Sequence, residues 1–481
     1  MTSATALNKA PWKHRDTVQI GSHIAVVETT SGAVRGYIRN GIYTFKGLPY
    51  GTPVSGARRF MPASLAEPQP GVRACLHYGN ICPQALTTPV DSGGLSEPND
   101  EDLFLLLRTG GRPVGEDCLL LNIWTPEING ATNRPVMVWL HGGGFAFGCG
   151  HDLAAYDGEN LAHQDAVVVT INHRLGLLGH LNLAELGDAR YASSGNIAML
   201  DQVLALQWVR ANIARFGGDP GNVMIYGQSG GGGKVSALMG MPSAKGLFQR
   251  AAIQSGSMPS GAPMKGTSMI ARAVLTELDI TPGQLDKLHT LPVEALLESG
   301  FAALRKLQRP MMMGWGPVVD GSILPEQPFG ESAPACSADV PLLVGTNMHE
   351  FISGVDNPAA YSMTESELEH KAKEQFGAEA PARLAAYRKS YPDAVPFDRW
   401  SLLASWFRPL AQHQAELKAL QGAAPAYLYW FTWRTPLLDG RPGAFHSSEI
   451  SYVFDNADRY EGYNGGGAET RSIYCRDSSP P

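Results

Sequence analysis

A serine set between glycines, directly after an apolar run, is the first residue pattern that could do chemistry. Gly227, Ser229 and Gly231 form a G-x-S-x-G motif, and the apolar run 222–226 precedes it. A sharp strand-to-helix turn around such a serine strains it and exposes its hydroxyl near a helix N-terminus, which favours negative charge. Flanking glycines remove Cβ atoms that would clash with neighbouring backbone. The pattern predicts a nucleophile at Ser229, although an ordinary Ser-Gly loop in a Gly-rich chain gives the same letters.

A second glycine-rich segment, His141–Phe145, also follows an apolar run. A serine nucleophile needs hydrogen-bond donors for the oxyanion of its tetrahedral intermediate, and consecutive glycines let bare backbone N–H groups face it. We predict that Gly143, Gly144 and Gly230 supply these donors. The alternatives are a flexible turn and a phosphate loop, but a Walker loop would continue with Gly-Lys-Ser/Thr, whereas Phe145 follows here.

The elements that must position these residues are short apolar strands that alternate with helical segments. Continuous apolar strands with helices between them predict an α/β fold with a mostly parallel sheet that is covered on both faces. Residues 201–216 show helical spacing with one apolar face. Two blocks rich in Ala, Leu, Glu and Lys, 268–310 and 364–422, are expected to be helical insertions around the sheet. The predicted strands are 136–140, 166–171, 222–226, 251–254 and 342–344.

Composition excludes several functional classes. The 481 residues include 38 Lys and Arg against 45 Asp and Glu, a net charge of −7, and no basic run, which argues against nucleic-acid binding. No stretch reaches the roughly 18 apolar residues of a membrane span, so we expect no stable membrane association. The first 24 residues lack the apolar core of a signal peptide. This indicates a cytoplasmic protein, with secretion after leader removal as the alternative.

The cysteines and histidines do not predict a metal centre. The six cysteines are too few for a disulfide scaffold, and no Cys/His cluster has zinc-ligand spacing. Serine chemistry of the kind predicted above needs neither a metal nor an organic cofactor. We therefore expect no metal and no cofactor.

Beyond these patterns, ten ordered segments resemble the type-B carboxylesterases, the cholinesterase-like family of α/β-hydrolases, and are most similar to the bacterial para-nitrobenzyl-esterase type. The resemblance implies the α/β-hydrolase fold, with helical insertions around an active-site gorge. It covers about residues 26–467. The matching segments are Thr44–Tyr50, Gly115–Asn122, His141–Phe145, Asn172–Gly176, Gly195–Gln202, Trp208–Asn212, Phe216–Pro220, Gln254–Ser257, Pro317–Gly321 and His446–Ile450.

The resemblance also supplies the partners of the serine. The family carries its acid in an N-x-x-E segment, which here points to Glu350, and its histidine in a His-Ser-Ser-Glu segment, which points to His446. The order Ser229, Glu350, His446 is that of α/β-hydrolases. His349, beside Glu350, is a competing base whose side chain should diverge from that of Glu350.

The function implied is a serine carboxylesterase that hydrolyses small to medium uncharged esters through an acyl-enzyme intermediate. Its partner is a small-molecule ester, and the oligomeric state is open. The alternatives are a non-catalytic binding protein that keeps the cholinesterase-like fold, and a lipase. Members of the family commonly have Glu before the serine and Ala after it, where this chain has Gln228 and Gly230. We expect the loss of that carboxylate to disfavour cationic esters.

Aromatic residues near these motifs could line the pocket for the ester. Phe145, Trp315 and Phe351 are the candidate substrate-binding residues, with a place in the core as the alternative for each. Phe351 stands where the family usually has Gly. Cys82 and Cys118 match a pair that some members join in a disulfide, and two buried thiols are the alternative.

The domain organisation expected is one catalytic unit with two extensions. Residues 1–24 form an N-terminal extension, 25–467 the α/β-hydrolase domain, and 468–481 an atypical polar tail. Members of the family usually continue past the histidine segment with further helices. We therefore expect that the tail reflects truncation or a shifted reading frame.

Overall fold

The central element of the computed structural model is a ten-stranded sheet in the order β1-β4-β5-β7-β9-β8-β10-β11-β14-β15. The structure describes residues 17–84, 113–130, 133–310, 314–355, 357–460 and 464. From β9 to β15 neighbouring strands are parallel, and the pairs from β1 to β9 are antiparallel. The strands of this sheet are β1 (Val18–Gln19), β4 (Tyr37–Arg39), β5 (Ile42–Pro49), β7 (Leu120–Thr125), β9 (Val167–Ile171), β8 (Arg134–Leu140), β10 (Gly218–Gln228), β11 (Arg250–Gln254), β14 (Leu342–Asn347) and β15 (Ala426–Phe431).

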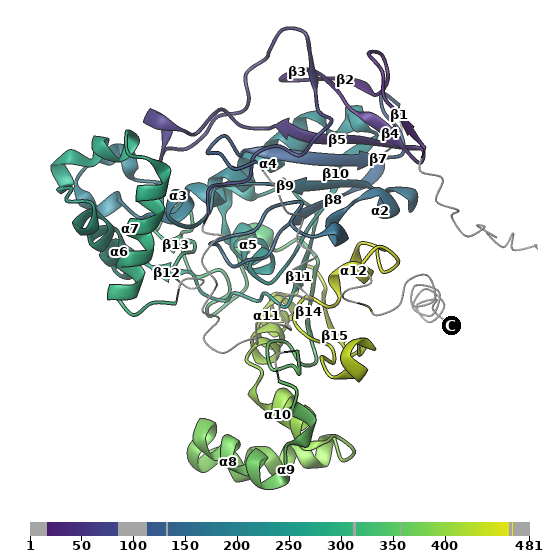
Figure 1. Cartoon of the computed structure of the whole chain (residues 1–481), viewed down its shortest axis with the longest axis vertical. Coiled ribbons are helices and arrows are strands. Elements are labelled where there is room, and N and C mark those ends of the chain that lie inside the picture. The colour runs from purple at the N-terminus through teal and green to yellow at the C-terminus, as the bar shows by residue number, and fades with distance from the viewer. Residues whose placement is uncertain are drawn as a thin grey trace, which may run out of the picture.

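Side chains alternate along the strands between two hydrophobic clusters. Val138 and Leu140 belong to the larger cluster with residues of α4, α5 and α11, whereas Trp139 between them belongs to the smaller one with residues of α2 and α12. Both faces of the sheet are therefore covered, as the continuous apolar runs predict (Figure 1). The helices are α2 (Glu159–His163), α3 (Gly176–His180), α4 (Ile197–Asn212), α5 (Gly230–Gly240), α6 (Met264–Glu277), α7 (Val293–Lys306), α8 (Glu365–Phe376), α9 (Ala380–Ser390), α10 (Pro396–Ala404), α11 (Phe407–Gln421) and α12 (Ile450–Val453).

Two small sheets accompany the large one. The first joins β2 (Val26–Thr29), β3 (Gly32–Arg35) and β6 (Val72–Ala74), and the second pairs β12 (Ala262–Pro263) with β13 (Val318–Val319). The segment 201–216 packs as its spacing predicts: Leu206, Val209, Ile213 and Phe216 are buried, and the exposed positions 207, 210, 211 and 214 share the opposite face. The first turns of α4 are buried more completely, and there a buried ion pair holds a charge inside, with Arg174 Nη2 2.6 Å from Asp201 Oδ1.

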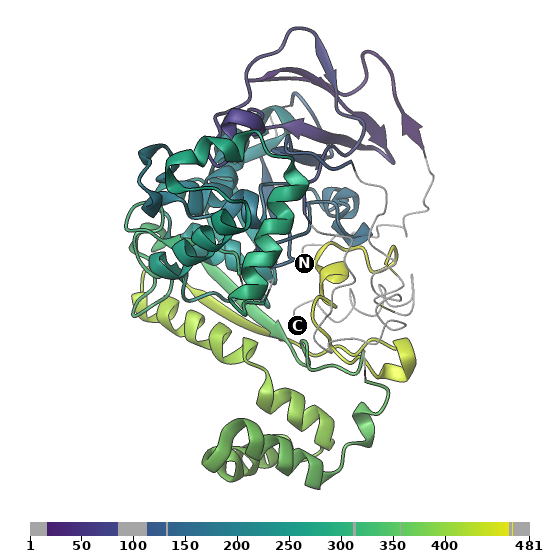
Figure 2. The same cartoon turned by 60° about the vertical axis from the view of Figure 1, so that its left-hand side comes forward.

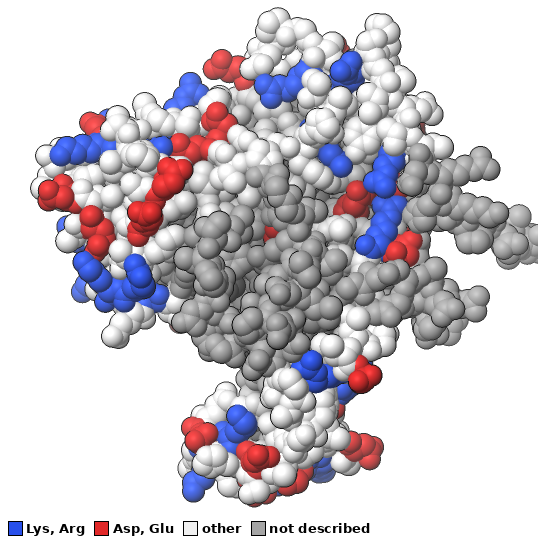
Figure 3. All heavy atoms as spheres, in the orientation of Figure 1, with Lys and Arg blue, Asp and Glu red and all other residues white. Residues whose placement is uncertain are grey.

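The predicted helical blocks form two lobes outside the sheet, together with α11, which packs on it. Helices α6 and α7 pack on each other, while α8, α9 and α10 stand away from the sheet as a helical projection of residues 365–404 (Figures 1 and 2). The projection has its own small core, which includes Leu368, Leu384 and Leu403. Acidic and basic side chains alternate over both lobes (Figure 3). The projection leads directly into α11, which returns to the sheet.

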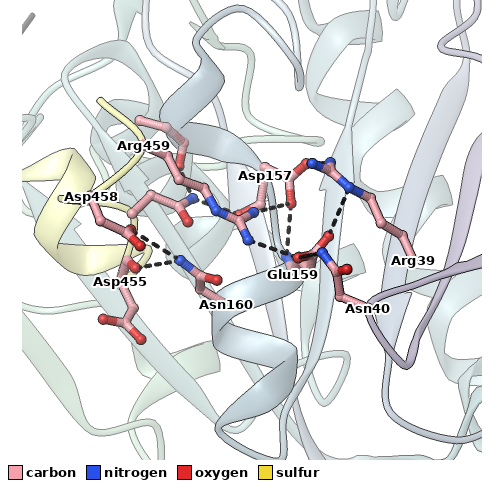
Figure 4. A network of polar contacts seen from close by, with 10 residues as sticks. Arg39, Asn40, Asp157, Glu159, Asn160, Asp455, Asp458 and Arg459 are labelled. Atoms are coloured by element: carbon pink, nitrogen blue, oxygen red, sulfur yellow. Dashed lines mark hydrogen bonds and ion pairs between the residues drawn. The ribbon is translucent and has the colours of Figure 1, made fainter. Parts of the chain in front are cut away.

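A polar network fastens the segment after α12 to the body of the molecule (Figure 4). Its centre is the buried carboxylate of Glu159, which accepts hydrogen bonds from Asn40 Nδ2 at 2.9 Å and Arg459 Nη2 at 2.7 Å. Arg39 Nε lies 3.4 Å from the same carboxylate. Burial alone would raise the pKa of Glu159, but the Asn40 hydrogen bond and the Arg459 charge lower it below its ordinary value. The network therefore holds a charged carboxylate between three parts of the chain.

Two expectations from the sequence remain predictions. Most of the N-terminal extension (1–24) and the whole C-terminal tail (468–481) lie outside the described residues, so the domain boundaries stay as predicted from the sequence. In the part of the chain that the structure describes, none of the helices combines the length and the apolar character that crossing a membrane requires.

Candidate active site

Ser229 occupies a strained turn between β10 and α5. Its backbone has φ 56° and ψ −125°, a left-handed conformation that is costly for any residue other than glycine. Its backbone N–H donates to the Gln254 carbonyl at the end of β11 at 2.8 Å, which ties the turn to the neighbouring strand. The half-buried side chain stands at the N-terminus of α5, where the helix dipole favours negative charge.

The glycines around Ser229 make room for neighbouring backbone. A Cβ at Gly231 would overlap the Leu140 carbonyl oxygen at the end of β8, and one at Gly230 would overlap the backbone of Gly144. A Cβ at Gly232 would lie 2.9 Å from the Gly256 Cα. The glycine run therefore serves close packing of backbone segments.

The predicted oxyanion segment lies against this turn. Gly143 and Gly144 have φ of 84° and 60°, which side-chain-bearing residues rarely adopt. The overlap between Gly144 and a Cβ at Gly230 shows that the segment packs on the first residue after Ser229. The structure thus brings together the three glycines that the sequence proposes as donors.

Glu350 and His446 form a short hydrogen bond. His446 Nδ1 lies 2.6 Å from Glu350 Oε2, and the backbone N–H of His446 donates to the Glu350 carbonyl at 3.1 Å. The other carboxylate oxygen, Oε1, accepts from the Asn347 N–H at 2.8 Å. Glu350 is only 1% exposed, so its carboxylate is fixed by these contacts and not by water.

The outer nitrogen of His446 faces the residue before the serine. His446 Nε2 lies 3.2 Å from the Gln228 side-chain nitrogen, which is its donor because Nδ1 carries the proton that faces Glu350. Within the described ranges, no hydrogen bond joins the Ser229 hydroxyl to His446. The imidazole therefore lies beside the Ser229 turn, and the lone pair of its Nε2 accepts a hydrogen bond from the Gln228 side chain.

The candidate pocket residues fall into two groups. Phe351 is 43% exposed and stacks on the His446 ring with centroids 4.0 Å apart, and Phe407 and Trp406 continue the aromatic row. Phe145 and Trp315 are instead 8% and 7% exposed. Both belong to the larger hydrophobic cluster, and Trp315 also lines a small cavity with Phe147 and Phe301, so their part in substrate binding stays a prediction.

His349, the competing base, has a structural place. It is fully buried, its Nε2 contacts Asp398 at 3.0 Å, and its Nδ1 accepts from the Ala444 N–H at 3.0 Å. The side chain thus joins α10 to the segment that carries His446. Glu350, its neighbour in sequence, makes the contact to His446.

Two buried ionisable residues near the site were not singled out from the sequence. Glu449 accepts from Asn347 Nδ2 at 2.6 Å, and burial together with the nearby Glu350 charge raises its pKa to about 7. Lys234 on α5 is fully buried, and burial lowers its pKa to about 7. The sequence does hold a signal for Lys234, because it is the one charged residue in the helix that follows the G-x-S-x-G motif.

The two cysteines of the candidate disulfide meet as free thiols. Cys82 and Cys118 are buried and hydrogen-bonded to each other, so the disulfide implied by the resemblance is not formed in this structure. The Leu175 N–H donates to the Cys82 sulfur at 3.3 Å. The hydrogen bond to Cys82, then burial, raises the pKa of Cys118 well above its ordinary value, which disfavours the thiolate that disulfide chemistry needs.

In the described ranges, no group of three or more His, Cys, Asp or Glu side chains is arranged around a possible ion. The site instead brings a strained serine, an imidazole, a carboxylate and a glycine segment close together at the carboxyl ends of neighbouring strands. These are the parts that acyl transfer through a serine requires.

The fold and the elbow at the end of β10 define an α/β-hydrolase. Residues 23–461 match the model of the carboxylesterase family. The chain belongs to this family, and it is a carboxylic ester hydrolase.

Individual relatives agree with the family. The chain is 36% identical over 441 residues to a para-nitrobenzyl esterase of Bacillus subtilis (strain 168), covering 91% of this chain and 84% of the relative. It is 32% identical to a phenmedipham hydrolase of Pseudarthrobacter oxydans, with 91% and 84% covered. The carboxylesterase EST55 of Geobacillus stearothermophilus superposes with a TM-score of 0.73 at 33% identity, with 93% and 87% covered. An esterase of Clostridium hathewayi described as able to hydrolyse aliphatic aromatic polyesters gives 0.75 at 33%, with 92% and 85% covered.

The packing at Gly231 predicts a loss of stability and activity in Gly231→Ala. The added methyl group must push the end of β8 away, and overpacking of this kind costs about 1–3 kcal/mol. Because the predicted oxyanion segment begins there, esterase activity should fall as well. Urea unfolding and p-nitrophenyl acetate hydrolysis measure both effects. Gly283→Ala, at a glycine with open space around it, is the matched control; equal behaviour of the two variants would contradict the packing argument.

The raised pKa of Glu449 predicts that Glu449→Gln removes part of the pH dependence of stability. A carboxyl whose folded pKa lies above its unfolded value favours folding less as pH rises through that interval. Moving a pKa from 4.5 to about 7 corresponds to about 3 kcal/mol at pH 8. The variant should therefore gain stability over the parent at pH 8 and match it near pH 4.5. Urea midpoints at the two pH values, with the exposed Glu379→Gln as control, check this; a gain of equal size at both would contradict it.

Proposed function

We propose that the chain hydrolyses small to medium uncharged carboxylic esters with Ser229 as nucleophile, His446 as general base and Glu350 as the orienting acid. The observation that carries the proposal is the 2.6 Å hydrogen bond between Glu350 and His446, made beside the strained Ser229 turn. Because the contact fixes the proton on Nδ1, it leaves Nε2 as the proton acceptor that nucleophilic attack needs.

The proposed steps follow from these positions. His446 takes the Ser229 proton as the oxygen attacks the ester carbonyl, and Glu350 stabilises the imidazolium that forms. The backbone N–H groups of Gly143, Gly144 and Gly230 hold the oxyanion. The alcohol leaves with a proton from His446, and water then repeats the sequence on the acyl-enzyme.

Gln228 must change partner during this cycle. In the resting arrangement its amide donates to His446 Nε2, the atom that the Ser229 hydroxyl needs. Catalytic hydrogen bonds are often incomplete before substrate binds and close in the complex. Gln228 also brings no charge to a position where the family commonly has a carboxylate. This supports uncharged over cationic esters.

The aromatic row supports esters with an apolar or aromatic group on the histidine side. Phe351 covers one face of the His446 ring and leaves nearly half of its own surface open. Relatives named for para-nitrobenzyl esters and aliphatic aromatic polyesters agree with such a group. No observation favours a lipase, and the family assignment argues against the non-catalytic binding protein.

Ser229→Ala should abolish hydrolysis of p-nitrophenyl acetate, with at least a 10³-fold loss of kcat, since removing a serine nucleophile leaves only residual catalysis. A fluorophosphonate probe should label the parent at Ser229 and leave the variant unlabelled. Activity within a few-fold of the parent would overturn the assignment. Ser260→Ala, in a loop outside the proposed site, is the control.

Phe351→Ala should lower kcat/KM for a p-nitrobenzyl ester more than for the ethyl ester of the same acid. Loss of an aromatic stack is worth about 0.5–1.5 kcal/mol, which corresponds to a change of about two- to twelve-fold in the ratio of the two substrates. Tyr427→Ala, which removes an exposed ring on β15, should leave that ratio unchanged. An unchanged ratio in Phe351→Ala would remove Phe351 from the pocket.

A further inference from the structure

Lys234 is a buried cation without an anion. It lies in the second turn of α5, five residues after Ser229, and its side chain is fully buried. Its Nζ donates to the His141 carbonyl at 2.8 Å and lies 5.6 Å from the centre of the Phe145 ring. Within the described ranges no carboxylate pairs with it. An unpaired buried ammonium is costly, so its place calls for a reason.

The groups that face Lys234 are neutral or positive. Three histidines lie near it: His141 after β8, His173 after β9 and His180 on α3. In each, Nδ1 lies within hydrogen-bond distance of a backbone carbonyl, at 2.9, 2.7 and 3.2 Å, so Nδ1 carries the proton and Nε2 carries a lone pair. Each of these Nε2 atoms is buried without a hydrogen-bond partner. Burial, together with the Lys234 charge, lowers the pKa of all three imidazoles and keeps them neutral. Arg174, the other nearby cation, is paired with Asp201.

The contact of Lys234 falls at the start of the glycine segment. The His141 carbonyl shares its peptide unit with Gly142, and a Cβ at Gly142 would lie 3.2 Å from the Gln228 carbonyl oxygen and 3.6 Å from the Ser229 Cβ. A charged donor on that carbonyl therefore fixes the segment where it meets the serine turn. Phe145, at the other end of the segment, packs against the same lysine.

We propose that Lys234 is a positioning residue for ester hydrolysis, which holds the segment 141–144 against the serine turn and provides a positive charge behind the oxyanion. The inference rests on the proposed function. Among the described residues this ammonium has no negative partner, so its attraction to the substrate arises only when the carbonyl oxygen becomes negative. An interaction that strengthens in the transition state raises kcat and leaves KM nearly unchanged.

The charge of Lys234 predicts a pH dependence of kcat, which a role in packing alone would not produce. Burial lowers the pKa of Lys234 to about 7, so the ammonium is present below that pH and is lost as pH rises through it. We therefore expect kcat to fall on the alkaline side, near pH 7 to 8.

The test compares Lys234→Met, Lys234→Arg and Lys418→Met. Lys418 on α11 is a second fully buried lysine, which donates to the Ser337 and Ala338 carbonyls at 2.9 and 2.8 Å, so it controls for the loss of a buried amine. kcat and KM for p-nitrophenyl acetate are measured from pH 5.5 to 9, and fluorophosphonate titration of each sample counts the competent serine.

For Lys234→Met we expect kcat to fall about 10- to 100-fold per titrated serine, with KM within about three-fold and the alkaline limb absent. Lys234→Arg, which stays charged, should keep more activity and move the alkaline limb above pH 8. Lys418→Met should keep the parent profile.

A parent-like kcat and pH profile in Lys234→Met would overturn the inference, as would a loss that is equal at every pH with the limb retained. If Lys234→Met does not fold, an unmoved alkaline limb in Lys234→Arg overturns the inference in its place. Failure of the proposed function is a different result: the parent itself would then remain unlabelled at Ser229.

Discussion

The candidate site depends on how closely three stretches of backbone approach one another at the end of the sheet. The carbonyl of Leu140, the glycine segment after it and the turn at Ser229 leave no room for a Cβ at Gly230 or Gly231. Ser229 itself is held with positive φ, a conformation that persists only when its surroundings over-determine it. The hydrogen bond from its N–H to Gln254 on β11 and the packing on β8 provide that support.

The imidazole reaches this turn from a distant part of the chain, and the structure secures it in steps. A backbone bridge joins Glu350 to Phe445, and Asn347 at the end of β14 donates to both the Phe445 carbonyl and Glu449. Beyond them, the Glu159 network holds Arg459 and hence the segment that follows α12. The proposed site therefore combines a rigid backbone half at β8 and β10 with a side-chain half that is anchored through buried polar contacts.

Local patterns in the sequence were sufficient to predict the strands, the helices and the turn at Ser229, because strand periodicity and glycine placement are local properties. The pairing of Glu350 with His446 could not follow from spacing, since 96 residues separate them and the resemblance alone joined them. The spacing on α4 predicted its packed face, but the inward-pointing charge of Asp201 could not be predicted, because it requires Arg174 from another element. For the same reason the core positions of Phe145 and Trp315, and the significance of Lys234, became evident only when all their neighbours were in place.

The division of the site into backbone and side-chain halves has an evolutionary consequence. Positions where glycine is required by overlap or positive φ tolerate almost no substitution, so the reaction itself is robustly inherited but closed to gradual change. Phe351, which stacks on His446, and Trp406, which stacks on Phe407, are partly exposed and can vary without disturbing that backbone. Selection for a new ester would therefore act first on this outer row and on the turn that connects the helical projection to α11, which makes substrate range the more evolvable property of this fold.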